Sequence, residues 1–218
     1  MADQEENPSA APLMAKGRME AFSDGVLAIA ITLLVLDVAI RPPGSPPEQF
    51  FRGWPSYLGY LVSFLTIGAA WIAHHALTDS LEGVDRIFLR LNLLFLLAVS
   101  LLPFPTRLVA EALDKTTDWQ RTSAVVYGIT LLVIRLLLSA LSGYARREHL
   151  RLPGPDEPDA QEARKKFRYV VTAYVITIGL AFLIPAAAIG LYFAIAVFQI
   201  APLRAIGRAV FGRSSRPS

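Results

Sequence analysis

Cysteine is absent from this chain of 218 residues. Its absence excludes disulfide bonds, thiolate nucleophiles and cysteine-ligated metal sites, and it leaves the redox compartment undetermined. Charge is also scarce, because Asp, Glu, Lys and Arg together make up 18% of the residues. Hydrophobic residues make up 54%, and the mean hydropathy is +0.45. Soluble domains of this length are rarely so apolar, so the composition predicts an integral membrane protein.

Recognisable catalytic motifs are also absent from the sequence. The neighbouring His74 and His75 diverge by about 100° on a helix, so they do not form the metal-binding pair of an HExxH motif. No serine nucleophile elbow and no glycine-rich phosphate loop occur. We therefore expect no enzyme activity and no bound cofactor. The net charge of +3 does not by itself indicate nucleic acid as a partner.

Apolar runs of membrane-spanning length dominate the sequence. A helix crosses the roughly 30 Å hydrocarbon core with about 20 residues, and six runs come close to that length. They cover residues 19–40, 54–77, 86–109, 119–143, 169–184 and 186–203. The last two share one long apolar stretch, in which Pro185 is expected to break the helix and form a tight hairpin. The predicted fold class is therefore all-α, with six transmembrane helices.

The segments outside these runs are too short to fold as separate domains. We expect residues 1–15 to be disordered, residues 16–205 to form the six-helix transmembrane domain, and residues 206–218 to be a flexible basic tail. No cleavable signal segment is evident at the N-terminus. Fifteen of the 21 lysines and arginines fall on the side that carries both termini. The distribution of positive charge therefore predicts cytoplasmic termini.

The first apolar run, "RMEAFSDGVLAIAITLLVLDV" at residues 18–38, has an apolar stripe on one side and a polar edge near its start. If Gly25 defines 0° on a helical wheel, Ile29, Thr32 and Leu36 fall at about 40°, −20° and 20°. These side chains form a narrow apolar stripe with a single hydroxyl. Such a stripe either packs against a neighbour or lipid, with Thr32 bonded to its own backbone, or lines a path through the membrane.

A polar edge lies at the start of the same run, away from the stripe. Placing the charged Asp24 inside a membrane is energetically unfavourable unless the carboxylate has a partner, so Asp24 is a candidate functional residue. In the second run, Trp71 and His75 share a helix face, while His74 points about 100° away. We expect a buried polar cluster at this level, built from Arg18, Ser23, Asp24, Trp71, a histidine and Asn92. Such a cluster either holds helices together or handles ions.

Three blocks of the sequence resemble one protein family. They are the segment at 18–38 with its Arg and Phe-Ser-Asp pattern, "FLTIGAAWIAHH" at 64–75, and "LNLLFLLAVSLLPFPT" at 91–106. In this order they resemble the prokaryotic relatives of the lysosomal potassium channel called transmembrane protein 175.

The resemblance implies an assembly and a pore. Prokaryotic members of the family carry one six-helix repeat and form homotetramers, in which the first helices line a central pore without a re-entrant carbonyl filter. When the family's pore-lining gate positions are transferred to this sequence, they correspond to Ile29, Thr32 and Leu36. The resemblance also implies that the Thr32 hydroxyls contribute to selectivity, with K⁺ passing transiently near them.

The polar cluster has a structural role in this resemblance. The resemblance implies that polar and aromatic side chains brace the base of the first helix against its neighbours. These residues are Arg18, Phe22, Ser23, Asp24, Trp71, His74, His75 and Asn92. Asp37 follows at the outer end of the first helix. A ring of Asp37 side chains would concentrate cations at the outer mouth, or each would be a solvated interfacial charge.

The sequence therefore predicts a potassium-preferring cation channel in the plasma membrane of a prokaryote. Its expected partners are other copies of itself, the lipid bilayer and permeant monovalent cations. The alternative is a secondary transporter that is proton-linked through Asp24 and His75, and a third interpretation is a structural membrane subunit without transport. No pair of runs shows a repeat with matched interruptions, which many transporters have, and this favours the channel.

Overall fold

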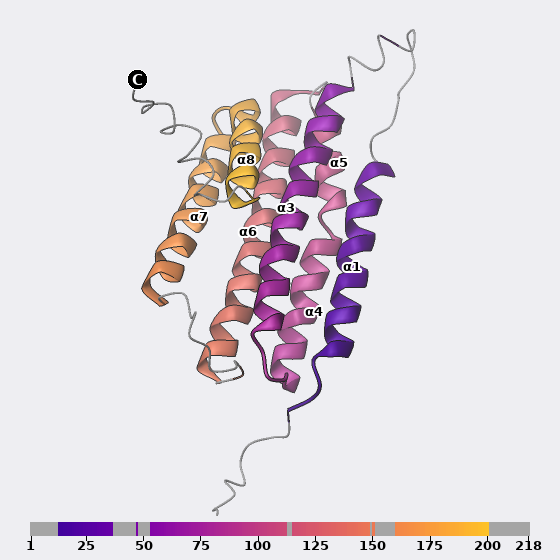
Figure 1. The fold of residues 1–218 in the computed structure, drawn as a ribbon. Helices are drawn as coiled ribbons and strands as arrows, with labels where there is room; N and C mark the ends of the chain where they lie inside the picture. Colours follow the sequence, from indigo (N-terminus) through magenta and orange to yellow (C-terminus); the bar gives the residue numbers. More distant parts are fainter. Residues whose placement is uncertain are drawn as a thin grey trace, which may run out of the picture.

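Seven helices make up most of the structure that is described. The computed structural model describes residues 13–36, 47, 53–112, 115–148, 150 and 160–200. The helices are α1 (Gly17–Leu36), α3 (Trp54–Asp79), α4 (Arg86–Ser100), α5 (Pro103–Ala112), α6 (Thr117–Arg147), α7 (Ala160–Ala181) and α8 (Pro185–Ile200). Figure 1 shows one elongated bundle, with α1 at one edge and α7 at the opposite edge. Within the described ranges the only strand pairing is a single bridge between Met14 and Val84, so the fold is all-α.

The bundle contains helices that are long and apolar enough to cross a membrane. Among the described residues four spans qualify, namely Gly17–Leu36, Ser56–Asp79, Arg86–Ala112, which comprises α4 and α5, and Thr117–Arg147. Two shorter apolar helices, Phe167–Ala181 and Pro185–Gln199, accompany them. At 1.5 Å per residue, the 16 residues of α8 extend for about 24 Å, which is less than a hydrocarbon core of roughly 30 Å. The last two predicted crossings therefore fall on α8 and on the apolar part of α7, both shorter than a standard span, although α7 as a whole is longer with 22 residues.

The third predicted run, 86–109, is not one continuous helix. α4 ends at Ser100, and α5 begins at Pro103. Pro103 has no N–H to donate and its ring clashes with the preceding turn, but the same residue is well suited to the first position of a new helix. Between α4 and α5 the backbone forms a turn that is tighter than an α-helical turn, in which Leu102 N donates to Val99 O at 3.0 Å.

A second proline separates α7 from α8. α7 ends at Ala181 and Pro185 opens α8, while Ile184 N donates to Leu180 O at 2.8 Å in the intervening turn. α7 also begins earlier than the predicted run, at Ala160. The helix therefore extends beyond the apolar stretch into the preceding basic segment.

Hydroxyl groups join the helices inside the bundle. Ser63 Oγ lies 2.7 Å from Thr106 Oγ1 and 2.8 Å from Tyr127 OH, so this group connects α3, α5 and α6. Tyr192 OH of α8 donates to Ala124 O of α6 at 3.2 Å. All five residues are buried. Because a membrane offers no water to buried polar groups, these hydroxyls must be satisfied within the protein, and they link helices as they do so.

Gly128 allows α6 to approach α7 and α8 closely. A Cβ atom at this position would lie 2.0 Å from Tyr192 OH and 2.7 Å from Ile178 Cγ1. Both distances are far inside van der Waals contact, so a side chain here would displace its neighbours. A Cβ atom at Gly179, in contrast, would meet nothing within 4 Å.

The chain ahead of α1 is fixed to the end of α3. Met14 and Val84 exchange backbone hydrogen bonds of 2.8 and 3.0 Å. Lys16 Nζ donates to Thr78 O at 2.7 Å and to Asp79 O at 3.1 Å. Carbonyl groups at a helix C-terminus carry partial negative charge and favour a cation. The start of α1 is therefore anchored by the lysine that precedes it.

These contacts modify one prediction about the chain ends. Residues 13–15, which were expected to be disordered, include the residue that pairs with Val84. Residues 1–12 and the predicted tail at 206–218 lie outside the described residues.

We expect Gly128→Ala to destabilise the bundle by about 1–3 kcal/mol, the usual cost of overpacking a core. The new methyl group would displace Tyr192 and break its bond to Ala124 O. Thermal unfolding of the purified protein in detergent measures the effect. Gly179→Ala is the matched control and should be neutral or slightly stabilising, because alanine favours helices over glycine. Equal unfolding temperatures for the two variants would contradict the close approach, and Tyr192→Phe should partly rescue Gly128→Ala.

Candidate functional site

α1 divides into a buried face and an exposed face. Its buried residues are Met19, Ser23, Leu27, Ala30 and Leu34, which recur every three or four positions and so share one side of the helix. This side packs against α3 and α4. In Figure 1, α1 has these neighbours on one side only. The remaining sides of α1 are therefore uncovered in the single chain.

The predicted stripe lies on the exposed part of α1. Ile29 is 61% exposed, Leu36 is 73% exposed, and Thr32 between them is exposed as well. Thr32 Oγ1 donates to Ile29 O at 2.8 Å, which is the backbone bond that the simpler interpretation expects. Donating its only proton leaves the hydroxyl oxygen with lone pairs that can accept from another group or coordinate a cation.

One half of the predicted polar cluster is a buried chain of hydrogen bonds. Asn92 Nδ2 donates to Ser23 Oγ at 2.9 Å, and Asn92 Oδ1 lies 2.8 Å from His74 Nε2. Because an amide oxygen can only accept, this geometry requires the proton on His74 Nε2. The His74 ring also stacks on Phe95, with centroids 5.3 Å apart. The four residues connect α1, α3 and α4, and all are buried.

The other half of the cluster runs along the exposed side of α3. Trp71 Nε1 donates to Asp24 Oδ1 at 2.9 Å, and the Trp71 ring stacks on His75 with centroids 5.6 Å apart. His75 Nε2 in turn lies 3.4 Å from Asp79 Oδ2. The recorded partner of Asp24 is thus a neutral indole N–H of the same chain. The sequence alone leaves the partner of Asp24 open among the members of the expected cluster.

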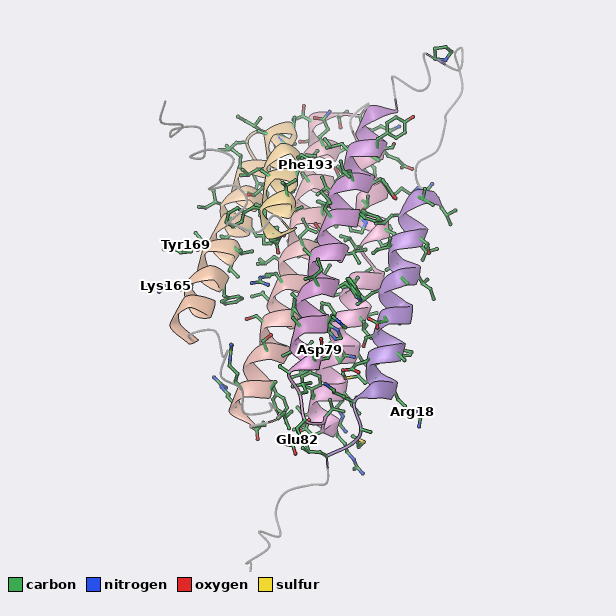
Figure 2. The ribbon with its side chains drawn as sticks, in the orientation of Figure 1. Arg18, Asp79, Glu82, Lys165, Tyr169 and Phe193 are labelled. Atoms are coloured by element: carbon green, nitrogen blue, oxygen red, sulfur yellow. The ribbon has the colours of Figure 1, made fainter. Side chains whose placement is uncertain are left out.

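Two residues of the predicted cluster stand apart from it. Arg18 and Phe22 are exposed, and Figure 2 shows Arg18 at the edge of the bundle beside the start of α1. Within the described ranges Arg18 makes no ion pair. Both line a groove of about 630 Å³ between the N-terminal segment, α1 and α4, together with Met14 and Leu93. The structure therefore unites Ser23, Asp24, Trp71, His74, His75 and Asn92, and directs Arg18 and Phe22 outward.

Some contributors to this region are not apparent in the sequence. Lys16 binds backbone carbonyls of α3, and backbone carbonyls give no signal in a residue pattern. Asp79 was detectable, because it follows His75 at the i, i+4 spacing of a helical pair. The predicted outer-mouth residue Asp37 lies outside the described residues. Among the described residues, no group of three His, Cys, Asp or Glu side chains is arranged to hold a metal.

Known proteins match the part of the chain that carries these features. The family model described as endosomal/lysosomal potassium channel TMEM175 matches residues 18–103. A protein from Streptomyces collinus that is named as a potassium channel is 41% identical over 170 residues, which cover 76% of this chain and 82% of that protein. Another protein named as a potassium channel, from Chamaesiphon minutus, is 34% identical over 189 residues and covers 84% of this chain and 92% of its own length.

Solved structures agree with these matches. The crystal structure of a lysosomal potassium-selective channel TMEM175 homolog from Chamaesiphon minutus superposes with a TM-score of 0.71 at 32% identity, over 84% of this chain and 95% of that one. The structure of a variant of the potassium channel MtTMEM175 shares the fold, with a TM-score of 0.60 at 18% identity. The class of protein is therefore an ion channel of the membrane and not an enzyme. The chain belongs to the TMEM175 family.

Vertebrate relatives match over a smaller region and carry a different name. The human protein named endosomal/lysosomal proton channel TMEM175 is 39% identical over 101 residues, which cover 41% of this chain and 20% of that protein.

We expect Asn92→Leu to lower stability by about 1–3 kcal/mol, because Ser23 and His74 would remain buried without this shared partner. Ser23→Ala should cost less, since it removes only one of the two bonds. Unfolding temperatures in detergent measure both effects, with Leu93→Ala as a control at an exposed neighbouring position. A stabilised Asn92→Leu protein would show that the hydrogen-bonded chain does not hold the three helices together.

Proposed function

We propose that this protein is a homotetrameric, potassium-preferring cation channel whose pore is lined by α1. The observation that carries the proposal is the position of Ile29, Thr32 and Leu36. The same three residues form a stripe on the helical wheel and lie on the exposed part of α1. A hydroxyl flanked by apolar side chains on an uncovered face suits a narrow pore lined by several copies.

A ring of subunits explains why α1 is covered on one side only. One chain offers a single candidate stripe and cannot enclose a path by itself. Rotation about a closed symmetry axis brings copies of the same stripe together. The buried residues of α1, such as Leu27 and Leu34, would then hold the helix on the scaffold of α3 and α4. The stripe would face the axis.

Permeation through such a pore would depend on water. Ile29 and Leu36 are separated by about 10 Å along the helix, so their rings would form two apolar constrictions with the Thr32 ring between them. Apolar constrictions gate by excluding water and offer no oxygen to replace a hydration shell. Four Thr32 oxygens would supply some of that coordination. The potassium-channel names of the prokaryotic relatives support K⁺ as the preferred ion.

The remaining features fit a channel in the plasma membrane of a prokaryote. We place six crossings in each subunit, counting α7 and α8 with the four longer spans, and both termini in the cytoplasm. The cluster of Ser23, Asp24, Trp71, His74, His75 and Asn92 would brace the cytoplasmic base of α1. Asp37 would lie near the outer mouth.

A second candidate function is proton-linked transport through Asp24 and His75. The proximity of His75 to Asp79 and the proton-channel name of vertebrate relatives favour this candidate. Reversal potentials in reconstituted bilayers separate the two functions. Unitary currents that follow the K⁺ gradient support the channel, whereas slow saturable flux that follows the pH gradient supports the alternative.

Assembly provides the first test of the proposal. We expect the purified protein to have the mass of a tetramer in detergent, since a single stripe cannot form a closed path. Light scattering or native mass spectrometry measures this mass. A stable monomer or dimer that still conducts would contradict the proposed arrangement.

Cysteine scanning provides the second test, and the native chain contains no cysteine to interfere. We expect Ile29→Cys, Thr32→Cys and Leu36→Cys channels to be blocked by a small water-soluble thiol reagent. Leu27→Cys and Leu34→Cys are the matched controls on the buried face and should not respond. Block at the control positions alone would place the pore on the other side of α1.

Polar and apolar substitutions should have opposite consequences along the stripe. We expect Ile29→Asn or Leu36→Asn to increase the current, because an amide wets an apolar constriction. Thr32→Val should instead lower the preference for K⁺ over Na⁺, because it removes the hydroxyl oxygens from the ion path. Current amplitude and bi-ionic reversal potentials measure the two effects. If the Asn variants lose stability with unchanged unitary current, the stripe faces lipid.

A further inference from the structure

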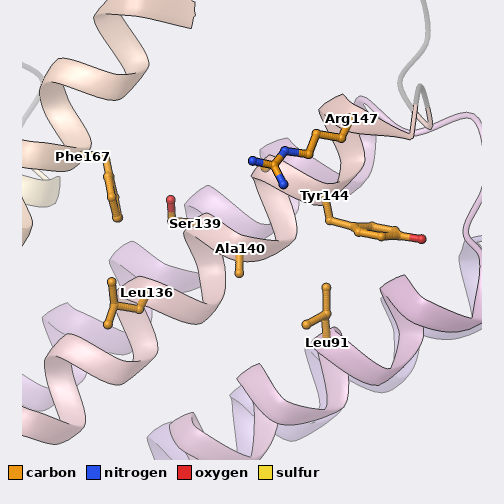
Figure 3. A pocket seen from close by; sticks show the side chains of 8 residues that line it. Leu91, Leu136, Ser139, Ala140, Tyr144, Arg147 and Phe167 are labelled. Atoms are coloured by element: carbon orange, nitrogen blue, oxygen red, sulfur yellow. The ribbon is translucent and has the colours of Figure 1, made fainter.

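A second cavity lies away from the proposed pore, between α4, α6 and α7. It has a volume of about 470 Å³ and is open to the surface of the bundle. Most of its lining is apolar and includes Leu91, Leu136, Ala140 and Phe167. Figure 3 shows Phe167 of α7 across the cavity from Leu91 of α4, with α6 between them. The cavity is therefore an apolar recess on the outer side of the bundle, remote from α1.

One end of this recess carries positive charge. Arg147 lines the cavity, and Figure 3 shows its guanidinium reaching over the recess toward Ser139. Arg146 and Arg147 occupy the last turn of α6, while Lys165 and Arg168 are exposed on α7. Basic side chains therefore come from two of the three helices that border the recess, α6 and α7.

Among the described residues, the acidic groups nearby do not neutralise this end. Asp85 accepts hydrogen bonds from Phe88 N at 2.7 Å and from Tyr144 OH. Figure 3 shows the Tyr144 hydroxyl directed away from the recess, so Tyr144 contributes only part of its ring to the lining. Glu148 follows Arg147 and is exposed to solvent. Within the part of the chain that the structure describes, the guanidinium of Arg147 therefore has no acidic partner at the mouth of the recess, and the walls beneath it are apolar.

We propose that this recess binds an anionic phospholipid of the cytoplasmic leaflet. The lipid phosphate lies at Arg147, and one acyl chain runs along Leu136, Ala140 and Phe167. Basic pockets between transmembrane helices on the cytoplasmic side recognise anionic headgroups in this way. A free phosphate ion is a poorer fit, because the walls below Arg147 offer little besides carbon. The inference rests on the orientation in the proposed function, which places this end of α6 at the cytoplasmic face.

Gly143 keeps the recess open. It lines the cavity, and a Cβ atom at this position would meet nothing within 4 Å. A larger side chain would therefore fill the space without clashing with the backbone, and it would also favour the helix. Gly143→Leu thus blocks the acyl path while leaving the charge of Arg147 in place.

Native mass spectrometry of the purified protein tests the inference. The protein is mixed in detergent with phosphatidylglycerol or phosphatidylcholine of identical acyl chains, and the retained lipid is counted. We expect the wild-type protein to retain phosphatidylglycerol in preference. Arg147→Gln should lower that retention about fivefold, and Gly143→Leu should lower it at least as much. Arg86→Gln and Gly179→Leu are the matched controls, at an exposed arginine and an open glycine outside the recess, and should retain lipid as the wild type does.

Several results would overturn the inference. Equal retention of the two lipids, or unchanged phosphatidylglycerol binding in both recess variants, would show that no anionic lipid site exists here. Loss of binding in Gly143→Leu but not in Arg147→Gln would indicate a neutral acyl pocket. Displacement of the lipid by millimolar inorganic phosphate would indicate a simple anion site. The measurement needs no ion flux, so its failure is distinguishable from failure of the channel proposal, which is measured as current.

Discussion

Asn92 holds together the helices on which the rest of this structure depends. Its side chain bonds Ser23 of α1 and His74 of α3 from its own position on α4. In a membrane, apolar packing alone discriminates poorly between helix and lipid, so a satisfied polar bridge fixes which helices meet and at what height. Lys16 adds a second attachment at the base of α1. The angular position of the exposed stripe follows from these two attachments.

Once the buried face of α1 is fixed, the opposite sides must find another neighbour. Lipid would accept Ile29 and Leu36, but the hydroxyl of Thr32 between them gains nothing from lipid. In the proposed tetramer, a ring of identical stripes would give that hydroxyl a function, and the uncovered helix would become the wall of a pore. Under that proposal, the polar base of α1 would position the helix, and its apolar remainder would line the path of the ion.

The helices behind α1 form a scaffold with its own close contacts. Gly128 brings α6 to within contact of Tyr192, and the Ser63 hydroxyl joins three helices at one point. Prolines set the interruptions, at Pro103 and Pro185. The divergence of α7 from α6 leaves the recess below Arg147, where the protein surface offers charge and an apolar groove side by side.

Much of the architecture could be predicted from the sequence, because hydropathy and helical spacing are local properties. They gave the positions of the helices, the interruption at Pro185, and the stripe of Ile29, Thr32 and Leu36. They also brought Ser23, Asn92 and the histidines into one cluster. The break of the third run before Pro103 has the same local cause as the break at Pro185, and it could have been predicted in the same way. Spacing could not show that Asp24 bonds the Trp71 indole or that Arg18 faces outward. Those outcomes depend on how separate helices rotate and slide against each other, and only the packed tertiary structure decides which polar atoms come within bonding distance.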